Sequence, residues 1–121
     1  DAPRRGGAAR GGGLDELERL HRHFEGMSPL HAVNTLALVV WALRANEGDF
    51  SAAVGEAVAA GWDTDCNGAT VGGLCGLSGA PIEARWTAPW QGRIGTRLAG
   101  HSELQLEDVV RRTVAVARAI P

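Results

Sequence analysis

The sequence contains no lysine and no tyrosine, and all 12 of its basic residues are arginine. Without lysine it has no phosphate-binding loop ending in Gly-Lys-Ser/Thr, and no Schiff base can form on a lysine amine. P-loop nucleotide hydrolases and enzymes that work through a lysine imine are therefore excluded for this chain.

The chain also lacks an excess of charge and a long apolar run. Its formal net charge is -2, and its arginines are scattered from Arg4 to Arg118, so we expect no nucleic-acid surface. The longest apolar run, residues 36–43, is far shorter than the roughly 20 residues that a membrane span requires. We therefore expect neither nucleic acid nor a membrane as a partner.

Cysteine is scarce, with only Cys66 and Cys75 present. Nine residues apart in one expected helix, they would lie on opposite faces at roughly 13 Å, too far for a disulfide. Two unpaired thiols in a small chain indicate a reducing compartment, so we expect a cytoplasmic protein.

The 121 residues suffice for one domain with its own core. Residues 1–13 are mostly glycine, alanine and arginine and predict a flexible arm or loop, followed by one domain over residues 14–121. No alternating strand pattern longer than four residues appears, so the predicted fold class is all-α.

Apolar spacing and capping signals predict five helices, over residues 14–25, 29–45, 50–60, 68–79 and 107–120. Ser28 followed by Pro29 indicates the start of the second helix, and Asp49 caps the third. The second helix is apolar on nearly every face and should be central in the fold.

Two further expectations concern packing. Gly68, Gly72 and Gly76 fall on one face of the fourth helix, where each costs about 1 kcal/mol relative to alanine, so we expect close approach of a neighbouring helix. The side chains expected to be covered in the C-terminal part are Val109, Val110, Val114 and Ala117 on the last helix, with Trp86, Pro89 and Trp90 over an edge of the core.

Residues 61–68, Gly-Trp-Asp-Thr-Asp-Cys-Asn-Gly, form what we call the acidic turn. Asp63 and Asp65 can converge on one hard divalent cation. The simpler alternative is that one of them caps the following helix and complements its dipole. An EF-hand loop is excluded, because its twelfth position must be glutamate and here is Leu74.

Other polar and aromatic residues have alternative roles. His31 and Asn34 share a face of the second helix, either as a satisfied pair in the core or as hydrogen-bond partners of the acidic turn. Trp62 either packs or stacks on a substrate base. His21 and His23 are expected on the surface, on different faces of the first helix.

The acidic turn and its flanks resemble the C-terminal metal motif of the ADP-ribosylglycohydrolase family, commonly Gly-Gly-Asp-Thr-Asp-Thr-Asn at the start of a glycine-rich helix. The resemblance continues in His31-Ala-Val-Asn34 with the apolar run after it, in residues 48–50 and in residues 84–89. It covers all but residues 1–13 and implies the bundle-like C-terminal part of that family's all-α fold.

The resemblance also implies a hydrolase that uses two Mg²⁺ or Mn²⁺ ions to cleave ADP-ribose from a modified protein or a small conjugate. Asp63 and Asp65 correspond to metal ligands, with Asp63 and Trp62 also next to the substrate. Cys66 stands where the family has a hydroxyl ligand, and a thiol is a poor ligand for Mg²⁺. Either Asn67, Thr70 or a water replaces it, or the second ion binds weakly.

The sequence has no Gly-Asp-Ala-Leu-Gly segment and no Ser/Thr-Asp-Asp run, which supply the family's other metal ligands. Because its first residue is not Met either, the chain is expected to be a C-terminal portion that is inactive alone. Apolar faces of the central helix should then be uncovered. We expect them to pack against a second copy of the chain or against a missing N-terminal segment. The alternative is a non-catalytic helical module that binds ADP-ribose or serves assembly.

Overall fold

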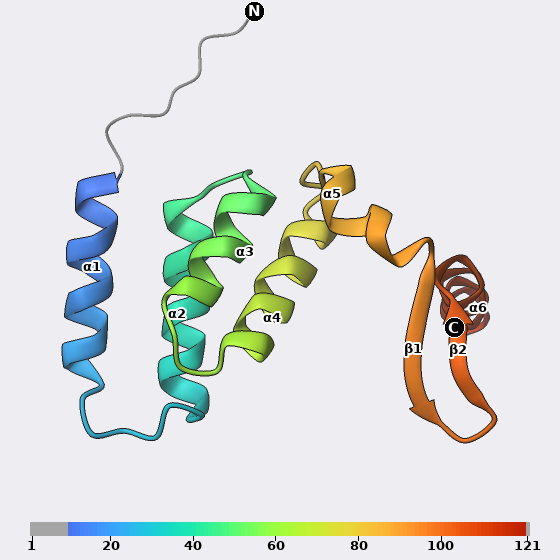
Figure 1. Cartoon of the computed structure of the whole chain (residues 1–121), viewed down its shortest axis with the longest axis horizontal. Coiled ribbons are helices and arrows are strands. Elements are labelled where there is room, and N and C mark those ends of the chain that lie inside the picture. Colours follow the sequence, from blue (N-terminus) through green and yellow to red (C-terminus); the bar gives the residue numbers. More distant parts are fainter. Residues whose placement is uncertain (1–9, 121) are drawn as a thin grey trace, which may run out of the picture. The chain divides into compact units, whose positions relative to one another are not determined.

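The computed structural model describes residues 10–120 and divides into two units, one through Ile82 and one from Glu83 onward (Figure 1). Most of the arm expected over residues 1–13 lies outside the described residues. The first helix begins at Arg10, so residues 10–13 are helical instead. The apolar pattern marks only the packed part of a helix, which here extends one turn further.

The first unit consists of four helices, α1 (Arg10–His23), α2 (Ala32–Ala45), α3 (Phe50–Ala59) and α4 (Thr64–Leu77). The chain runs alternately up and down through them, so α2 and α4 begin at the same end of the unit (Figure 1). Helix α3 packs on α4, both pack on α2, and α1 packs on α2. The core is small and made of the buried side chains Leu38, Val39, Ala42, Ala53, Ala57, Ala60, Val71 and Cys75.

Helix α2 begins three residues later than the sequence signal indicated. The Ser28 hydroxyl accepts only from the backbone N–H of Leu30, at 3.4 Å, and residues 28–31 form a turn. His31 is the N-cap instead, because its Nδ1 accepts from the backbone N–H of Val33 at 3.2 Å. An imidazole nitrogen thus replaces the predicted serine cap.

The predictions for α3 and the end of α2 are confirmed. Helix α2 ends at Ala45, and the Asp49 carboxylate caps α3 by accepting from the N–H of Ala52 at 2.9 Å. Helix α4 starts at Thr64, earlier than the predicted residue 68, so part of the acidic turn is its first helical turn.

Close packing of α4 on α3 is confirmed at two of the three spaced glycines. A Cβ on Gly68 would lie 2.9 Å from Cγ2 of Val58, and one on Gly72 would lie 3.7 Å from Phe50. A Cβ on Gly76 would meet nothing within 4 Å, so the expectation is wrong there. The helices meet at the start of α4 and diverge toward its end.

The second unit contains the short helix α5 (Ala84–Thr87), the 3-10 turn η1 (Ala88–Trp90), strands β1 (Arg93–Leu98) and β2 (His101–Gln105), and helix α6 (Leu106–Ala119). The strands form an antiparallel hairpin in which Ile94 pairs with Leu104, and Gly100 in the turn has φ of 74°. The sequence did not predict this hairpin. Burial alternates over only the first four residues of β1, and β2 is almost wholly exposed, so the alternation is too short to indicate a half-buried strand. With a sheet this small, the fold remains all-α.

Within the described residues of the second unit, most of the apolar side expected to be buried on α6 is left uncovered. Val110, Val114 and Ala117 are exposed, Val109 is half-buried, and Trp90 is exposed as well. Spacing identifies which face of an amphipathic helix is apolar, but it carries no information about whether another element packs there.

Helix α2 also has an exposed apolar stripe, formed by Val33, Leu36 and Val40. The uncovered face expected on the central helix is therefore present in the described residues. Across residues 10–120, every helix is too short or too polar to cross a membrane.

Candidate metal centre

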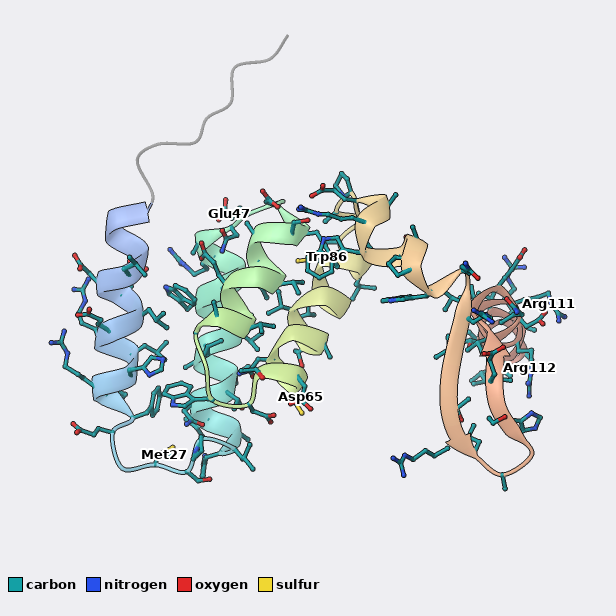
Figure 2. The ribbon with its side chains drawn as sticks, viewed as in Figure 1. Met27, Glu47, Asp65, Trp86, Arg111 and Arg112 are labelled. Carbon is teal, nitrogen blue, oxygen red and sulfur yellow. The ribbon has the colours of Figure 1, made fainter. Side chains whose placement is uncertain are left out.

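The acidic turn leads from α3 into the first turn of α4. Asp63 occupies the N-cap position of α4, and Asp65 lies in its first turn at one end of the unit (Figure 2). The Asp63 side chain makes no capping hydrogen bond, in contrast to Asp49 at the same position of α3. The Asp63 carboxylate therefore does not cap α4, which was the simpler alternative to a metal-binding role.

The Asp63 carboxylate instead belongs to a group of three ligand-type side chains. Oxygen atoms of Asp63 and Asp65 and the sulfur of Cys66 all lie within 4.8 Å of one another. Asp63 is half-buried, whereas Asp65 and Cys66 are exposed. Among residues 10–120, no other three Asp, Glu, His or Cys side chains converge in this way.

These side chains interact with one another. A hydrogen bond with the Asp63 side chain, reinforced by the backbone N–H groups of Cys66 and Asp65, holds the pKa of Asp65 below its ordinary value. The same Asp63 carboxylate raises the pKa of the Cys66 thiol, first through a hydrogen bond and then through charge, to which Asp65 adds. Asp63 is thus the centre of the group, and Cys66 remains a thiol at neutral pH.

The chemistry of the donor set fits a divalent ion. Carboxylate oxygens are hard ligands of the kind Mg²⁺ and Mn²⁺ prefer. Two oxygens at the Mg²⁺ distance from one ion lie at most about 4.2 Å apart, so small side-chain rotations bring Asp63 and Asp65 into range. The Cys66 sulfur is a softer donor and fits Mn²⁺ or a more thiophilic ion better than Mg²⁺.

Asn67 and Thr70, the expected substitutes for a hydroxyl ligand, differ in their hydrogen bonding. The Thr70 hydroxyl donates to the carbonyl of Cys66 at 2.8 Å. Asn67 is 2% exposed, and its Nδ2 is buried without a hydrogen-bond partner among the described residues. Buried amide donors normally have a hydrogen-bond acceptor, so this Nδ2 is available to donate to one.

His31 and Asn34 do not form the core pair that their spacing indicated. His31 is exposed and caps α2. Asn34 is fully buried, donates from Nδ2 to the carbonyl of Ser28 at 3.0 Å and accepts from the N–H of Thr35 at 2.9 Å. In the described residues these bonds stay near the start of α2. That start and the Met27 loop lie at the same end of the unit as Asp65 (Figure 2).

Trp62 packs against α1 and the residue that follows it. Its ring stacks on His21 with centroids 4.4 Å apart at 24°, and Phe24 meets it edge-on at 6.1 Å. The surface assignment of His21 is wrong, because the side chain is half-buried. The signal was present in the sequence, since Leu17, His21 and Phe24 follow the apolar spacing of α1.

Comparison with known protein families matches residues 4–118 to the ADP-ribosylglycohydrolase family. No curated protein and no solved structure gives a significant match. The matched region includes both units and the whole acidic turn. The all-α fold, the aspartates at the start of a glycine-rich helix and this match agree, and the chain belongs to the ADP-ribosylglycohydrolase family.

Proposed function

We propose that this chain supplies the Asp-x-Asp metal motif of a hydrolase that cleaves ADP-ribose from a modified protein side chain or a small conjugate. Family membership supports the reaction class. The observation that carries the assignment to residues is the convergence of Asp63, Asp65 and Cys66 within 4.8 Å.

The local geometry favours a ligand role over a purely structural one. Asp49 shows how an N-cap aspartate behaves in this protein, with its carboxylate bonded to the helix backbone. Asp63 leaves that bond unmade and faces Asp65 and Cys66. Two adjacent carboxylates repel each other once both are ionised, and a divalent cation relieves that repulsion.

Asp63 and Asp65 would hold Mg²⁺ or Mn²⁺, two ions in the complete family site. A bound ion supplies Lewis acidity, a more acidic water and a template for the ribose hydroxyls. The chain would contribute a pair of carboxylates at the start of α4, and Asp63 would also lie next to a bound ribose. The buried Asn67 amide can donate to an oxygen of the ligand or of a water.

The experiment is calorimetric titration of the chain with MnCl₂ and MgCl₂, comparing wild type with Asp63→Asn and Asp65→Asn. Both variants keep the side-chain volume and remove one charge. We expect each to weaken binding at least tenfold, while Asp49→Asn, the matched cap aspartate, leaves affinity unchanged. Equal affinity in wild type and both site variants contradicts the metal assignment.

A second function is favoured by one observation. Residues 10–120 contain a single group of three potential ligands, whereas the family site holds two ions. A non-catalytic module that binds ADP-ribose or serves assembly needs no complete site. Titration with ADP-ribose in the presence of Mn²⁺ measures binding, and an assay for ADP-ribose release from an ADP-ribosylated protein is run with and without an added N-terminal segment that carries the family's other metal ligands. Release restored by that segment supports the hydrolase, and binding without release in both samples supports the module.

We also propose a cytoplasmic location. Both cysteines are free, and Cys66 is exposed, which suits a reducing compartment. Expression with and without an oxidising environment tests this, because an intermolecular disulfide through Cys66 is expected only in the oxidised sample.

A further inference from the structure

The two residues before Asp63 have left-handed backbone conformations. Gly61 has φ of 90° and Trp62 has φ of 59°. Glycine adopts such angles freely, but a side chain with a Cβ does not, so Trp62 stays there only if its surroundings hold it. The conformation of Trp62 directly sets where the chain enters Asp63.

Trp62 packs against the buried core, and its aromatic neighbours come from α1 and the residue that follows it. His21 stacks on one face of the indole at 4.4 Å, and Phe24 meets it nearly at a right angle. We call His21, Phe24 and Trp62 the aromatic clasp. It connects the first helix of the unit to the turn before the candidate metal ligands.

His21 contributes its ring face rather than a hydrogen bond. Its Nε2 is buried and has no hydrogen-bond partner among the described residues. A buried polar nitrogen without a partner is unfavourable, so the hydrogen-bonding capacity of His21 contributes nothing here. What the side chain contributes is a flat ring, stacked on the indole of Trp62 with the ring planes 24° apart.

We propose that His21 is a positioning residue for the metal centre: its stack on Trp62 holds the left-handed turn and so keeps Asp63 in place as a ligand. This inference rests on the proposed function. Without the stack, Trp62 relaxes to an ordinary φ in part of the molecules, and only the remaining fraction presents Asp63 correctly. Apparent metal affinity falls in proportion to that fraction.

The test is calorimetric titration of the full chain with MnCl₂, at a temperature where circular dichroism shows each variant to be folded. His21→Ala is expected to weaken Mn²⁺ binding by about three- to tenfold, the range that an aromatic pair contributes to an equilibrium. His21→Phe keeps the stack and is expected to bind as wild type does. Arg19→Ala, an exposed position on the same helix, is the matched control.

A double-mutant cycle separates positioning from general stability. In a Trp62→Gly background, residue 62 adopts the left-handed conformation without help from a ring. His21→Ala is therefore expected to have no further effect on Mn²⁺ affinity in that background, although it has an effect in wild type. If His21→Ala does not fold, His21→Leu, which keeps apolar bulk without an aromatic face, takes its place.

The outcomes distinguish the two proposals. Wild-type binding of Mn²⁺ that His21→Ala leaves unchanged, with or without a lower melting temperature, overturns the clasp and leaves the metal centre standing. A weakening by His21→Phe equal to that by His21→Ala also overturns it. Absence of Mn²⁺ binding in wild type overturns the metal centre, and the clasp with it.

Discussion

Gly68 and Val58 bring the start of α4 against α3 so closely that a Cβ on Gly68 would lie 2.9 Å from Cγ2 of Val58. Real Cβ atoms do not approach a carbon this closely, so one of the two helices or the valine would have to move. The contact is made by the last residue of the acidic turn. It therefore fixes the part of α4 that carries Asp65 and Cys66.

Gly68→Ala is expected to lower the free energy of unfolding by about 1 kcal/mol. Overpacking of this kind costs about 1–3 kcal/mol, and the better helix propensity of alanine returns about 1 kcal/mol. Chemical denaturation followed by circular dichroism measures the difference. Combining Gly68→Ala with Val58→Ala removes the clash, and in that background the alanine is expected to stabilise.

Gly73→Ala is the matched control on the same helix, because a Cβ there meets nothing within 4 Å. We expect it to stabilise by roughly 0.5–1 kcal/mol. If Gly68→Ala stabilises as much as Gly73→Ala does, the close approach of α3 and α4 is not as described.

Substitution of Asn34 distinguishes a structural role in the core from a role in orienting the acidic turn. Its side chain is fully buried and is bonded to Ser28 and Thr35. Asn34→Ala is expected to cost about 1–2 kcal/mol of stability, because both hydrogen bonds and some packing are lost. Mn²⁺ affinity should stay unchanged, and Asn46→Ala, at a half-buried asparagine at the other end of α2, should cost less.

A loss of Mn²⁺ affinity without a loss of stability would instead support a role of Asn34 at the acidic turn. A tenfold loss of Mn²⁺ affinity at unchanged stability would mean that Asn34 orients the acidic turn through contacts made only when metal is present. Melting curves and titrations on the same samples distinguish the two.

The helices were predictable where local signals and packing agree. The Asp49 cap and the end of α2 at Ala45 were both correct, because a cap and an apolar pattern indicated the same boundary. The start of α2 was not, since Ser28 and His31 compete for the cap and only the three-dimensional structure decides between them. The hairpin of β1 and β2 was missed because its strands bury little.

At the candidate site, too, features set by the local sequence were predictable and features set by tertiary packing were not. The convergence of Asp63 and Asp65 could be predicted from their spacing and motif, which are local properties. The stack of His21 on Trp62 could not, because Trp62 is 41 positions away and the contact depends on how α1 packs. Similarly, the apolar side of α6 was identified correctly as a face, while its exposure depends on what covers it.

Cys66 is expected to react slowly with iodoacetamide for an exposed thiol. Asp63 and Asp65 raise the pKa of its thiol, so less of the nucleophilic thiolate is present near neutral pH. Asp63→Asn removes the charge of that carboxylate and weakens its hydrogen bond with the thiol, which lowers the pKa of Cys66 and should speed alkylation severalfold. Mass spectrometry resolves Cys66 from the buried Cys75, whose rate serves as the internal reference. An Asp63→Asn rate equal to that of wild type contradicts this interaction.

Cys66→Thr tests how the thiol tunes the metal preference. It replaces a soft donor with the kind of hydroxyl ligand that Mg²⁺ favours, so we expect Mg²⁺ affinity to rise on the order of fivefold, about 1 kcal/mol. Binding of Co²⁺ should give a thiolate charge-transfer absorption in wild type that the variant loses. Cys75→Ala, which removes the other thiol, should keep that absorption. If the wild-type Co²⁺ spectrum has no such band, and Mg²⁺ affinity is the same in both proteins, then Cys66 lies beside the ion without binding it.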